Sequence, residues 1–434
     1  MQKTGIFQYV VIGVFIAFIV IGAILFATYK SSQTSGSKPV SITMWGTLPK
    51  VSFDKFITEY TANMTTKFSI NYTEKDTANF DADLIEALAS GTGPDTIILP
   101  QTLIARYVNK IFTIPYTTLP EGTFKGDYAQ GSEIYLNTVG TYAIPFAIDP
   151  MVMYWNRDIF NQAGIAKPPT TWNSVNALVP KLAKIDANKN VLQSAVALGE
   201  YRNINDAKEI LSTLLLQIGN PIISTNDQGL LENNLNIKNG NVNLAESVLQ
   251  FYTNFSNPQS NLYSWNRSLV NSLEAFTDGD LAIYFGLASE YTKMRQKNPN
   301  LNFDVAMIPQ IQDSKTAVTF GNQYGFAILK SSPNISDAYN VIMQITGADA
   351  VPVWSPLFAF SSARRDILAV TETNAVRDAF NKSALISQSW IDPNYSATSN
   401  IFQEMVESYT TARSNLGSAV STASAKLGAL LGGQ

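Results

Sequence analysis

The alternation of strand-like and helix-like segments after residue 40 constrains the fold more than any other feature of the sequence. Residues 40–45 (VSITMW) and 68–72 (FSINY) alternate apolar and polar side chains, which is typical of half-buried strands. Residues 96–99 (TIIL) form a short apolar run, as expected for a strand buried on both faces of a parallel sheet. Helical patterns that begin near Ser52 and Phe80 separate these strands. This order predicts a doubly wound α/β domain.

The composition is that of a large globular protein without thiol or imidazole chemistry. The chain has 434 residues, enough for two or three domains, of which 45% are hydrophobic and 15% are charged. A net charge of -4 argues against a nucleic-acid partner, which would require a basic face. Because the sequence contains no Cys and no His, thiol nucleophiles, His bases and Cys or His metal ligands are excluded. We therefore expect no cofactor and no metal.

Residues 1–30 are interpreted as a membrane anchor. Residues 10–27 (VVIGVFIAFIVIGAILFA) contain no charged side chain and, at about 1.5 Å per residue, reach the hydrocarbon thickness of a bilayer. A retained single-pass transmembrane helix is predicted, and a cleaved signal peptide is the alternative. Residues 31–40 are polar and are expected to form a flexible tether. The globular part would then lie on the extracellular or periplasmic side of the cell membrane.

The rest of the chain predicts a second lobe that is rich in helices. Residues 210–218 and 244–255 are strongly apolar helical segments. Residues 276–286 (FTDGDLAIYFG) indicate a helix end, a tight turn and then a strand. Near the end of the chain, Phe402, Met405 and neighbouring apolar residues share one face of a long helix.

No local pattern identifies a catalytic site. Asp149, Glu200 and Glu290 are acidic residues that could act in glycoside hydrolysis, because such pairs are defined only by their separation in space. Since nothing selects an acid and its partner, the chain is predicted not to be an enzyme, and a glycoside-processing enzyme is the less favoured alternative. The 6 Trp and 19 Tyr fall mostly at predicted strand ends and loops. Such rings suit a sugar, whose C–H face stacks on aromatic side chains while polar groups bind its hydroxyls.

Several segments, taken in order, resemble those of bacterial extracellular solute-binding proteins of the maltodextrin-binding type, the substrate-binding components of ABC transporters. The segments are residues 87–98 (ALASGTGPDTII), 142–149 (YAIPFAID), 153–160 (MYWNRDIF), 168–172 (PPTTW), 276–286 (FTDGDLAIYFG), 305–309 (VAMIP) and 321–328 (GNQYGFAI). The resemblance covers about residues 41–430.

The resemblance implies an α/β, two-lobed periplasmic-binding-protein-like fold of type II. In this chain the predicted N-terminal transmembrane helix would precede it. Lobe one would comprise residues 41–148 and 309–346, and lobe two residues 149–306 and 350–434. The ligand would bind between the lobes, outside the carboxyl ends of the strands. The lobes would close around it by a hinge motion.

The resemblance also implies a function. The protein would act as a monomer, capture a carbohydrate or similar polar solute, and deliver it to ABC permease subunits in the membrane. Residues 287–289 (LAS) stand where maltodextrin binders carry an aromatic side chain, which argues against maltodextrin but not against another sugar. A binder of a non-sugar solute and a ligand-sensing ectodomain remain alternatives.

Ten residues near matched strand ends are predicted to line the cleft. Asp149 lies at the crossover between lobes, where maltodextrin binders carry a hydroxyl-binding acid. The other nine are Trp45, Thr47, Gln101, Asn322 and Tyr324 from lobe one, and Tyr201, Gly286, Trp354 and Trp390 from lobe two.

Overall fold

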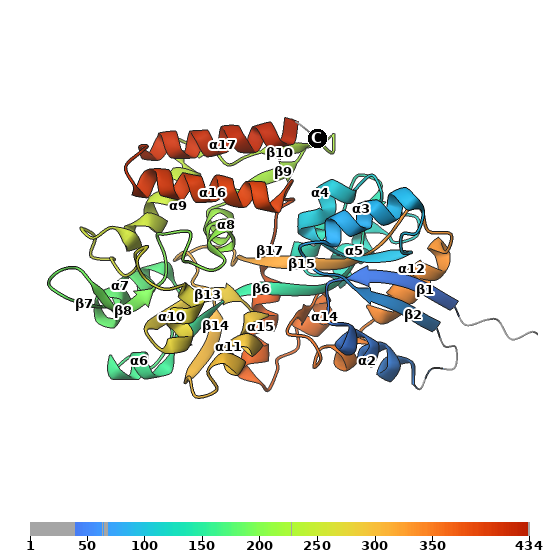
Figure 1. Ribbon diagram of the computed structural model, residues 1–434, viewed down its shortest axis with the longest axis horizontal. Helices are drawn as coiled ribbons and strands as arrows, with labels where there is room; N and C mark the ends of the chain where they lie inside the picture. The colour runs from blue at the N-terminus through green and yellow to red at the C-terminus, as the bar shows by residue number, and fades with distance from the viewer. Residues whose placement is uncertain (1–39, 63, 65–67, 227, 433–434) are drawn as a thin grey trace, which may run out of the picture.

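The computed structural model describes residues 40–62, 64, 68–226 and 228–432, which form two lobes lying side by side (Figure 1). The predicted anchor and all of the predicted tether except Val40 lie outside these residues. Within the described ranges, no helix is long and apolar enough to cross a membrane. The two-lobed α/β architecture agrees with the prediction.

Lobe one is built on three parallel strands, with β1 (Val40–Gly46) between β2 (Phe68–Glu74) and β3 (Thr96–Pro100). These confirm the three strands predicted in this part of the chain. The remaining elements are α2 (Lys50–Thr61), α3 (Phe80–Ser90), η1 (Gln101–Leu103), α4 (Ile104–Tyr107), β4 (Ile114–Pro115), α5 (Glu121–Asp127), η2 (Gln130–Tyr135), β5 (Gly140–Thr141), α12 (Ile335–Ile345), α13 (Val351–Trp354) and α14 (Arg365–Leu368).

Lobe two has β8 (Val191–Val196) parallel to β13 (Leu281–Leu287), with β7 (Lys184–Ile185) at its edge. The predicted turn before β13 is confirmed. Helix α10 (Ser272–Asp278) is capped by Gly279, whose φ of 91° suits glycine. The other elements are α6 (Arg157–Gln162), α7 (Trp172–Leu182), α8 (Ala207–Gln217), β9 (Ile223–Thr225), β10 (Leu231–Asn233), β11 (Lys238–Asn239), β12 (Val242–Asn243), α9 (Leu244–Thr253), η3 (Asn254–Ser256), α10 (Ser272–Asp278), α11 (Glu290–Lys297), β14 (Phe303–Met307), α15 (Ala375–Leu385), α16 (Tyr395–Thr410) and α17 (Leu416–Gly432).

Two long strands carry the sheet from one lobe into the other (Figure 1). The first half of β6 (Ile144–Asn156) pairs with β15 (Thr319–Ile328) and with the short β16 (Ser361–Ser362). Its second half pairs with β13 and β14. Because β15 also pairs with β3 and with β17 (Ser387–Gln388), one 11-stranded sheet runs through both lobes.

The buried hydrophobic side chains form two clusters that meet within β6. Ile148 and the residues before it in β6 belong to the cluster of lobe one, whereas Met151 and those after it belong to lobe two. Asp149 and Pro150 separate the two clusters. Pro150 has no N–H to donate, which suits a point where the strand changes partners.

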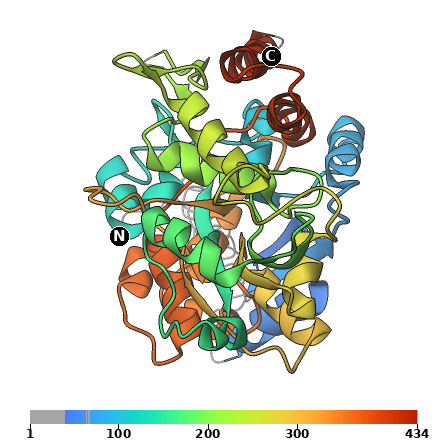
Figure 2. The ribbon, with the colours of Figure 1, turned by 90° about the vertical axis from the view of Figure 1, so that its left-hand side faces the viewer.

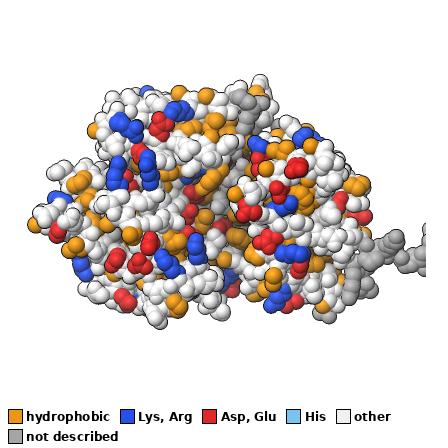
Figure 3. Space-filling model, in the orientation of Figure 1, with side chains coloured by type: hydrophobic (Ala, Val, Ile, Leu, Met, Phe, Trp, Pro, Cys, Tyr) orange, Lys and Arg blue, Asp and Glu red, His pale blue; other side chains and the backbone are white. Residues whose placement is uncertain are grey.

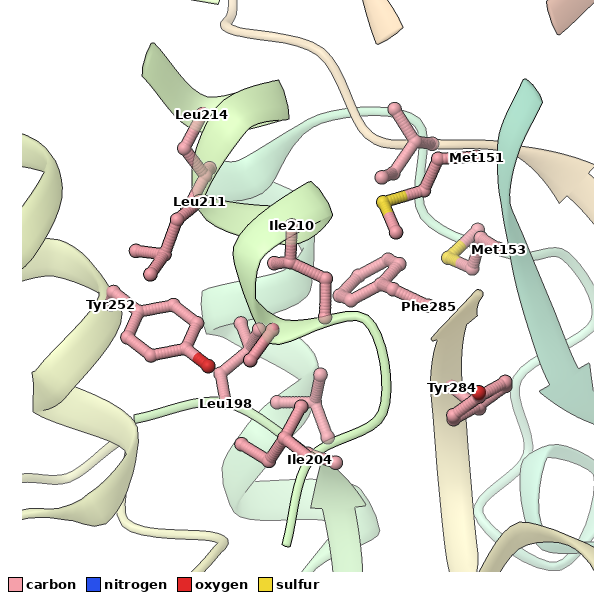
Figure 4. Packing of buried hydrophobic residues seen from close by; sticks show 14 of the residues in the cluster. Met151, Met153, Leu198, Ile204, Ile210, Leu211, Leu214, Tyr252, Tyr284 and Phe285 are labelled. Atoms are coloured by element: carbon pink, nitrogen blue, oxygen red, sulfur yellow. The ribbon is translucent and has the colours of Figure 1, made fainter. Parts of the chain in front are cut away.

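In lobe two, α8 fills the space between the sheet and α9. Figure 4 shows Ile210 facing Phe285 and Met151, whereas Leu211 lies toward Tyr252 of α9. Every residue of α8 from Ala207 to Leu216 is buried, so the helix is enclosed by its own lobe on nearly all sides. This packing fixes the position of the α8 N-terminus.

The antiparallel helices α16 and α17 form one edge of lobe two and are seen nearly end-on in Figure 2. They pack beside the β9–β10 hairpin, where the Asn233 side-chain amide donates to the Ser424 carbonyl at 2.7 Å. This helix pair brings the start of α16 toward lobe one.

One segment lies differently from its predicted place. Lobe two was expected to resume at residue 350, but Val351, Trp354 and Phe358 belong to the hydrophobic cluster of lobe one. The chain returns to the second cluster at Ala379 and Phe380 of α15.

The Asp95 carboxylate connects three elements of lobe one. Its oxygens accept hydrogen bonds from the Thr43 backbone N–H and hydroxyl, both at 2.8 Å, on β1. The Ser332 hydroxyl (2.6 Å) and the Asn334 amide (3.1 Å) donate from the segment before α12. Burial alone would raise the pKa of Asp95, but these hydrogen bonds outweigh it and hold the pKa below its ordinary value.

We expect Asp95→Asn to lower the free energy of unfolding by about 2–3 kcal/mol at pH 7, because an amide cannot accept all four hydrogen bonds. Since the folded pKa lies below the unfolded one, the carboxylate stabilises the fold at neutral pH, and this contribution is lost as pH falls through the folded pKa. The urea unfolding curves of the wild type and variant should therefore differ at neutral pH, and the difference should shrink as pH falls below about 4. The exposed Asp313→Asn change is the control, and equal midpoints for Asp95→Asn and wild type at pH 7 would contradict this role.

Candidate binding site

The strands of both lobes end at the same place, beside Asp149. In lobe one, β3 ends at Pro100, and the Gln101 that follows contacts Asn322, the residue paired with Asp149 across the sheet. In lobe two, β13 ends at Leu287, and the Ser289 backbone N–H then donates to the Asp149 carboxyl at 2.9 Å. Ligands of open α/β sheets bind outside the carboxyl ends of strands. The surface is hollowed where the two lobes meet, and acidic side chains are visible in this hollow (Figure 3).

Two predicted residues, Gln101 and Asn322, are hydrogen-bonded to each other at the crossover. The Gln101 amide donates to the Asn322 side-chain carbonyl at 2.7 Å, and the Gln101 carbonyl accepts from the Gln323 backbone N–H at 2.8 Å. Both the nitrogen and the oxygen of the Gln101 side-chain amide are thereby hydrogen-bonded, and this amide orients the Asn322 side chain beside Asp149. Among the described residues the Asn322 amide nitrogen has no acceptor, so it remains a donor for a ligand.

Two carboxyl groups from lobe two join Asp149. The Asp206 and Glu290 carboxyls hydrogen-bond to each other, and the Tyr284 hydroxyl donates to Glu290 at 2.7 Å. Burial, followed by repulsion from Glu290, Glu209 and Asp149, raises the pKa of Asp206 well above its ordinary value. Burial also raises the pKa of Glu290, and it raises that of Asp149 to about 7, with a smaller contribution from the Glu290 charge. Burial therefore makes ionisation of all three acids less favourable than in water, and Asp149, with a pKa of about 7, is partly protonated at neutral pH.

Gly286, another predicted residue, makes room for this group. A Cβ at position 286 would collide with the Glu290 carboxyl, and it would lie 2.5 Å from the Tyr284 ring. Glycine is therefore the only residue that lets Glu290 reach the Tyr284 hydroxyl. Its role at the site is to leave space.

A cavity of about 510 Å³ opens between the starts of α8 and α16. The predicted Tyr201 lines it, with its hydroxyl 2.9 Å from that of Ser399. The Tyr395 side chain is 48% exposed at the first turn of α16, and its hydroxyl donates to Glu209 at 2.9 Å. Asp206, Glu209 and Tyr395 thus present acidic and aromatic groups to one cavity.

A buried ion pair supports the floor of this cavity. The Lys208 ammonium lies 2.5 Å from the Asp392 carboxylate, and both side chains are almost fully buried. The same ammonium is not free to contact a ligand. It also donates to the Thr398 hydroxyl at 2.8 Å and lies 3.8 Å from the centre of the Tyr395 ring. Lys208 therefore holds Tyr395 in place while its charge is balanced by Asp392.

Lobe one contributes two partly exposed aromatic side chains, Trp45 and Tyr324. Trp45 is partly exposed at the end of β1, with the Lys75 ammonium 3.9 Å from its ring centre. Thr47 follows it and is exposed. Tyr324 is partly buried beside Phe360, and burial followed by the Asp149 charge raises its pKa, so its hydroxyl stays protonated.

Two predicted tryptophans pack inside the lobes and are not brought to this group. Trp354 is fully buried in lobe one, with its ring 4.6 Å from that of Phe146. Trp390 is 4% exposed, and its indole N–H donates to the Ser212 hydroxyl at 3.1 Å. Trp390 instead borders a separate cavity of about 370 Å³ beside η2 and β9. Trp354 and Trp390 therefore lie apart from the group around Asp149, although Trp390 borders a cavity that residues of both lobes line.

The sequence reasoning did not select Asp206, Glu209 or Tyr395. For Tyr395 a signal exists, because Asn394 caps α16 by accepting from the Ala397 N–H at 3.0 Å. An aromatic directly after such a cap lies in the first turn of a helix and can project from its end. For Asp206 and Glu209 no local signal distinguishes them from ordinary residues at a helix start.

Comparison with known protein families identifies the family to which this chain belongs. Residues 46–342 match the family described as bacterial extracellular solute-binding protein. The chain belongs to this family. Its members are binding proteins and not enzymes, which agrees with the prediction from the sequence.

Solved structures share the fold of this solute-binding protein. A cyclo/maltodextrin-binding protein complexed with maltotetraose is 15% identical, with a TM-score of 0.72 over 91% of this chain and 98% of that chain. An ABC transporter solute-binding protein from Thermotoga lettingae, bound with α-D-tagatose, is 16% identical, with a TM-score of 0.65 over 90% and 100%. At these identities the likeness establishes the two-lobed fold.

A curated relative gives a similar result at the sequence level. A protein of Brucella abortus (strain 2308), named as a binding protein, is 22% identical over 261 residues, which are 59% of each chain. The solute-binding protein thus spans about 59% of the length of the curated relatives it matches.

The buried acids make the stability of this solute-binding protein depend on pH. Because the folded pKa values of Asp149, Asp206 and Glu290 lie above the unfolded ones, their contribution is most favourable at low pH and is lost as pH rises through the folded values. We expect the melting temperature without ligand to fall between pH 5 and pH 8. Asp206→Asn should reduce this fall in melting temperature. Asn keeps a donor for Glu290 and removes a carboxylate whose ionisation destabilises the fold by about 1.4 kcal/mol per unit of pKa shift.

Asn also tolerates the left-handed conformation of Asp206, whose φ is 51°. Differential scanning calorimetry at several pH values measures the effect, with the exposed Asp313→Asn change as the control. The same decline in Asp206→Asn and in the wild type would show that these acids do not interact as described.

Proposed function

We propose that this protein captures a carbohydrate or similar polar solute between its lobes and delivers it to an ABC permease. The proposal rests on the position of Asp149, which lies at the boundary of the two hydrophobic clusters, is paired with Asn322 across the sheet and accepts a hydrogen bond from the Ser289 N–H. Asn322 and Gln101 belong to lobe one, and the Ser289 N–H belongs to lobe two. A solute bound here would touch both lobes at once.

The side chains around the hollow suit a sugar. Carboxyl and amide groups bind hydroxyls in a directed way, while aromatic rings such as Tyr395 and Trp45 cover the C–H faces. Proteins of the same fold were solved with maltotetraose and with α-D-tagatose. The proposed ligand-binding residues are Trp45, Thr47, Gln101, Asp149, Tyr201, Gly286, Asn322 and Tyr324, together with Asp206, Glu209, Glu290 and Tyr395.

The connection between lobes permits closure. β6 and β15 cross at Asp149 and Asn322, and the register of β15 shifts between Tyr324 and Gly325. Bending at these strands would change the distance between lobes without disturbing either hydrophobic cluster. Closure is favoured only by contacts that a solute makes with both walls in the closed state.

The proposal also includes the membrane. The apolar residues 10–27 support a single-pass anchor that would hold the lobes, as a monomer, on the outer side near the permease subunits. Fractionation of cells that express the full-length chain tests this part, because deletion of residues 1–30 should release the protein from the membrane.

A sugar ligand is expected to stabilise the full-length protein, kept in mild detergent because of residues 10–27. At a ligand concentration 100 times Kd, the stabilisation should be about 2.7 kcal/mol, since the ligand binds only the folded state. Thermal shift against a panel of mono- and oligosaccharides measures it. A correctly folded protein that responds to no sugar would overturn the carbohydrate proposal.

Asn322→Ala should weaken binding of the identified sugar about tenfold, the equivalent of one hydrogen bond of roughly 1.4 kcal/mol. Tyr395→Ala should weaken it by a similar factor through loss of ring stacking, whereas Tyr395→Phe should keep most of the affinity. Titration calorimetry gives the Kd values, and the control is Tyr409→Phe, at a partly buried tyrosine that does not line the cavity. Unchanged affinity in both Asn322→Ala and Tyr395→Ala would place the sugar elsewhere.

A further inference from the structure

Helix α8 begins with a buried cation, in a place that does not favour one. Lys208 is the second residue of the helix (Ala207–Gln217), and it is 4% exposed. The first turn of a helix carries a partial positive charge, so an ammonium group there is repelled. Burial adds a desolvation cost, which the Asp392 carboxylate has to offset. Because neutral residues often replace a buried ion pair without loss of stability, Lys208 points to a role other than stability.

All three N–H groups of the Lys208 ammonium are directed at one segment of the chain. They reach the Asp392 carboxylate, the Thr398 hydroxyl at 2.8 Å and the Tyr395 backbone carbonyl at 3.4 Å. These acceptors lie just before α16 (Tyr395–Thr410) or in its first turn. An ammonium group has three donors, so none is left for a ligand. Lys208 therefore borders the cavity of about 510 Å³ without offering it a free donor.

The Tyr395 side chain is held at two points by consecutive residues of α8. The Lys208 ammonium lies 3.8 Å from the centre of its ring, a cation–π contact on one face. Its hydroxyl donates to the carboxylate of Glu209 at 2.9 Å. Tyr395 is nevertheless 48% exposed and lines the cavity. Since the ammonium occupies one face of the ring, the opposite face is the one that a ligand can use.

A tryptophan of lobe one shows the same arrangement. The Lys75 ammonium lies 3.9 Å from the centre of the Trp45 ring, and it pairs with the Asp83 carboxylate at 2.9 Å. Trp45 and Tyr395 are the two rings proposed above to cover the C–H faces of a sugar. Lys75 follows a strand, whereas Lys208 begins a helix. The feature that the two sites share is therefore the aromatic ring, backed by a lysine whose charge an aspartate balances.

Building on the proposed function, we propose that Lys208 is a positioning residue, which holds the Tyr395 ring so that one face is ready to stack on a sugar. Lys208 itself does not bind the solute. A ring that is already fixed loses little freedom when a ligand binds, so more of the stacking energy appears as affinity. Without the ammonium, Tyr395 rotates about its side-chain bonds in the open cavity. The affinity then falls although the ring is still present.

The test is a double-mutant cycle on binding. Lys208→Met is combined with Asp392→Asn, so that no buried carboxylate is left without its cation, and the full-length protein in mild detergent is titrated by calorimetry. The probe is whichever of glucose, galactose, mannose and the β-1,4-linked glucose disaccharide binds most tightly to the wild type. We expect this pair of substitutions to raise Kd about fivefold when Tyr395 is present, and less than about twofold when it is added to Tyr395→Ala.

A matched control removes another lysine–carboxylate pair of lobe two. Lys426 on α17 pairs with Glu404 on α16, and neither lines the cavity. Lys426→Met with Glu404→Gln should leave Kd within about twofold of the wild type. If scanning calorimetry shows the Lys208→Met variant to be unfolded, Lys208→Gln with Asp392→Asn takes its place, because two amides can still hydrogen-bond to each other. The same Kd values are expected of it.

A second measurement reports on the ring without any ligand. N-acetylimidazole acetylates accessible tyrosine hydroxyls, and mass spectrometry of the peptide that contains Tyr395 gives the rate at this residue. In the wild type the hydroxyl is bonded to Glu209 and the ring is held against Lys208. Loss of Lys208 should raise the rate of acetylation of Tyr395 at least threefold. The Lys426 control pair should leave this rate unchanged.

The outcomes separate this inference from the proposed function. Equal rises in Kd with and without Tyr395, or no rise in either case, would show that Lys208 does not act through this ring, and the inference would be wrong. An unchanged rate of acetylation in the Lys208 variant would overturn it as well, whether or not a sugar binds. If no sugar of the panel binds but acetylation of Tyr395 accelerates as expected, the carbohydrate proposal fails and the positioning of the ring by Lys208 stands.

Discussion

The burial of β6 along its whole length is the constraint on which the rest of the structure depends. All thirteen residues from Ile144 to Asn156 are buried, yet the strand belongs to two hydrophobic clusters. A strand can serve two clusters only if its partners change midway, and the change falls at Asp149 and Pro150. The same change places one ionisable side chain at the junction, where it is 2% exposed. The position of the candidate binding site is therefore a consequence of how the lobes are joined.

A buried acid at such a junction is unfavourable unless other groups compensate it. Asp149 receives the Ser289 N–H, but the neighbouring Asp206 and Glu290 add to the cost of ionisation, so protons are retained instead. This differs from Asp95, where four donors hold the carboxylate in its charged form. Asp95 has a full set of partners and stabilises lobe one. The acids of the hollow lack such a set, which is the condition expected of groups that await a ligand.

The sequence predicted the fold well because the fold depends on local patterns. Backbone structure can be predicted directly from the alternating residues in 40–45 and 68–72 and from the turn at Gly279. Residue roles were less predictable, since a tryptophan near a strand end looks the same whether it faces a ligand or a core. Trp354 packs on Phe146, and Trp390 is held by Ser212, contacts that depend on residues far away in the chain. Asp149 was selected from the family resemblance, and the structure adds that it is paired with Asn322 across the sheet.

The position of Asp206 and Glu209 at one cavity could not be predicted from the sequence, because it depends on where α8 begins in space. Its residues Ala207 to Leu216 are buried, and the packing of Ile210 and Leu211 against the sheet and α9 leaves the helix no freedom to shift. Its N-terminus, which carries a partial positive charge, is thereby directed at the hollow. That charge partly offsets the acids around it, so α8 both completes the core of lobe two and lowers the cost of placing Asp206 and Glu209 at its start. The stability of the lobe and the chemistry of the site are in this way set by the same helix.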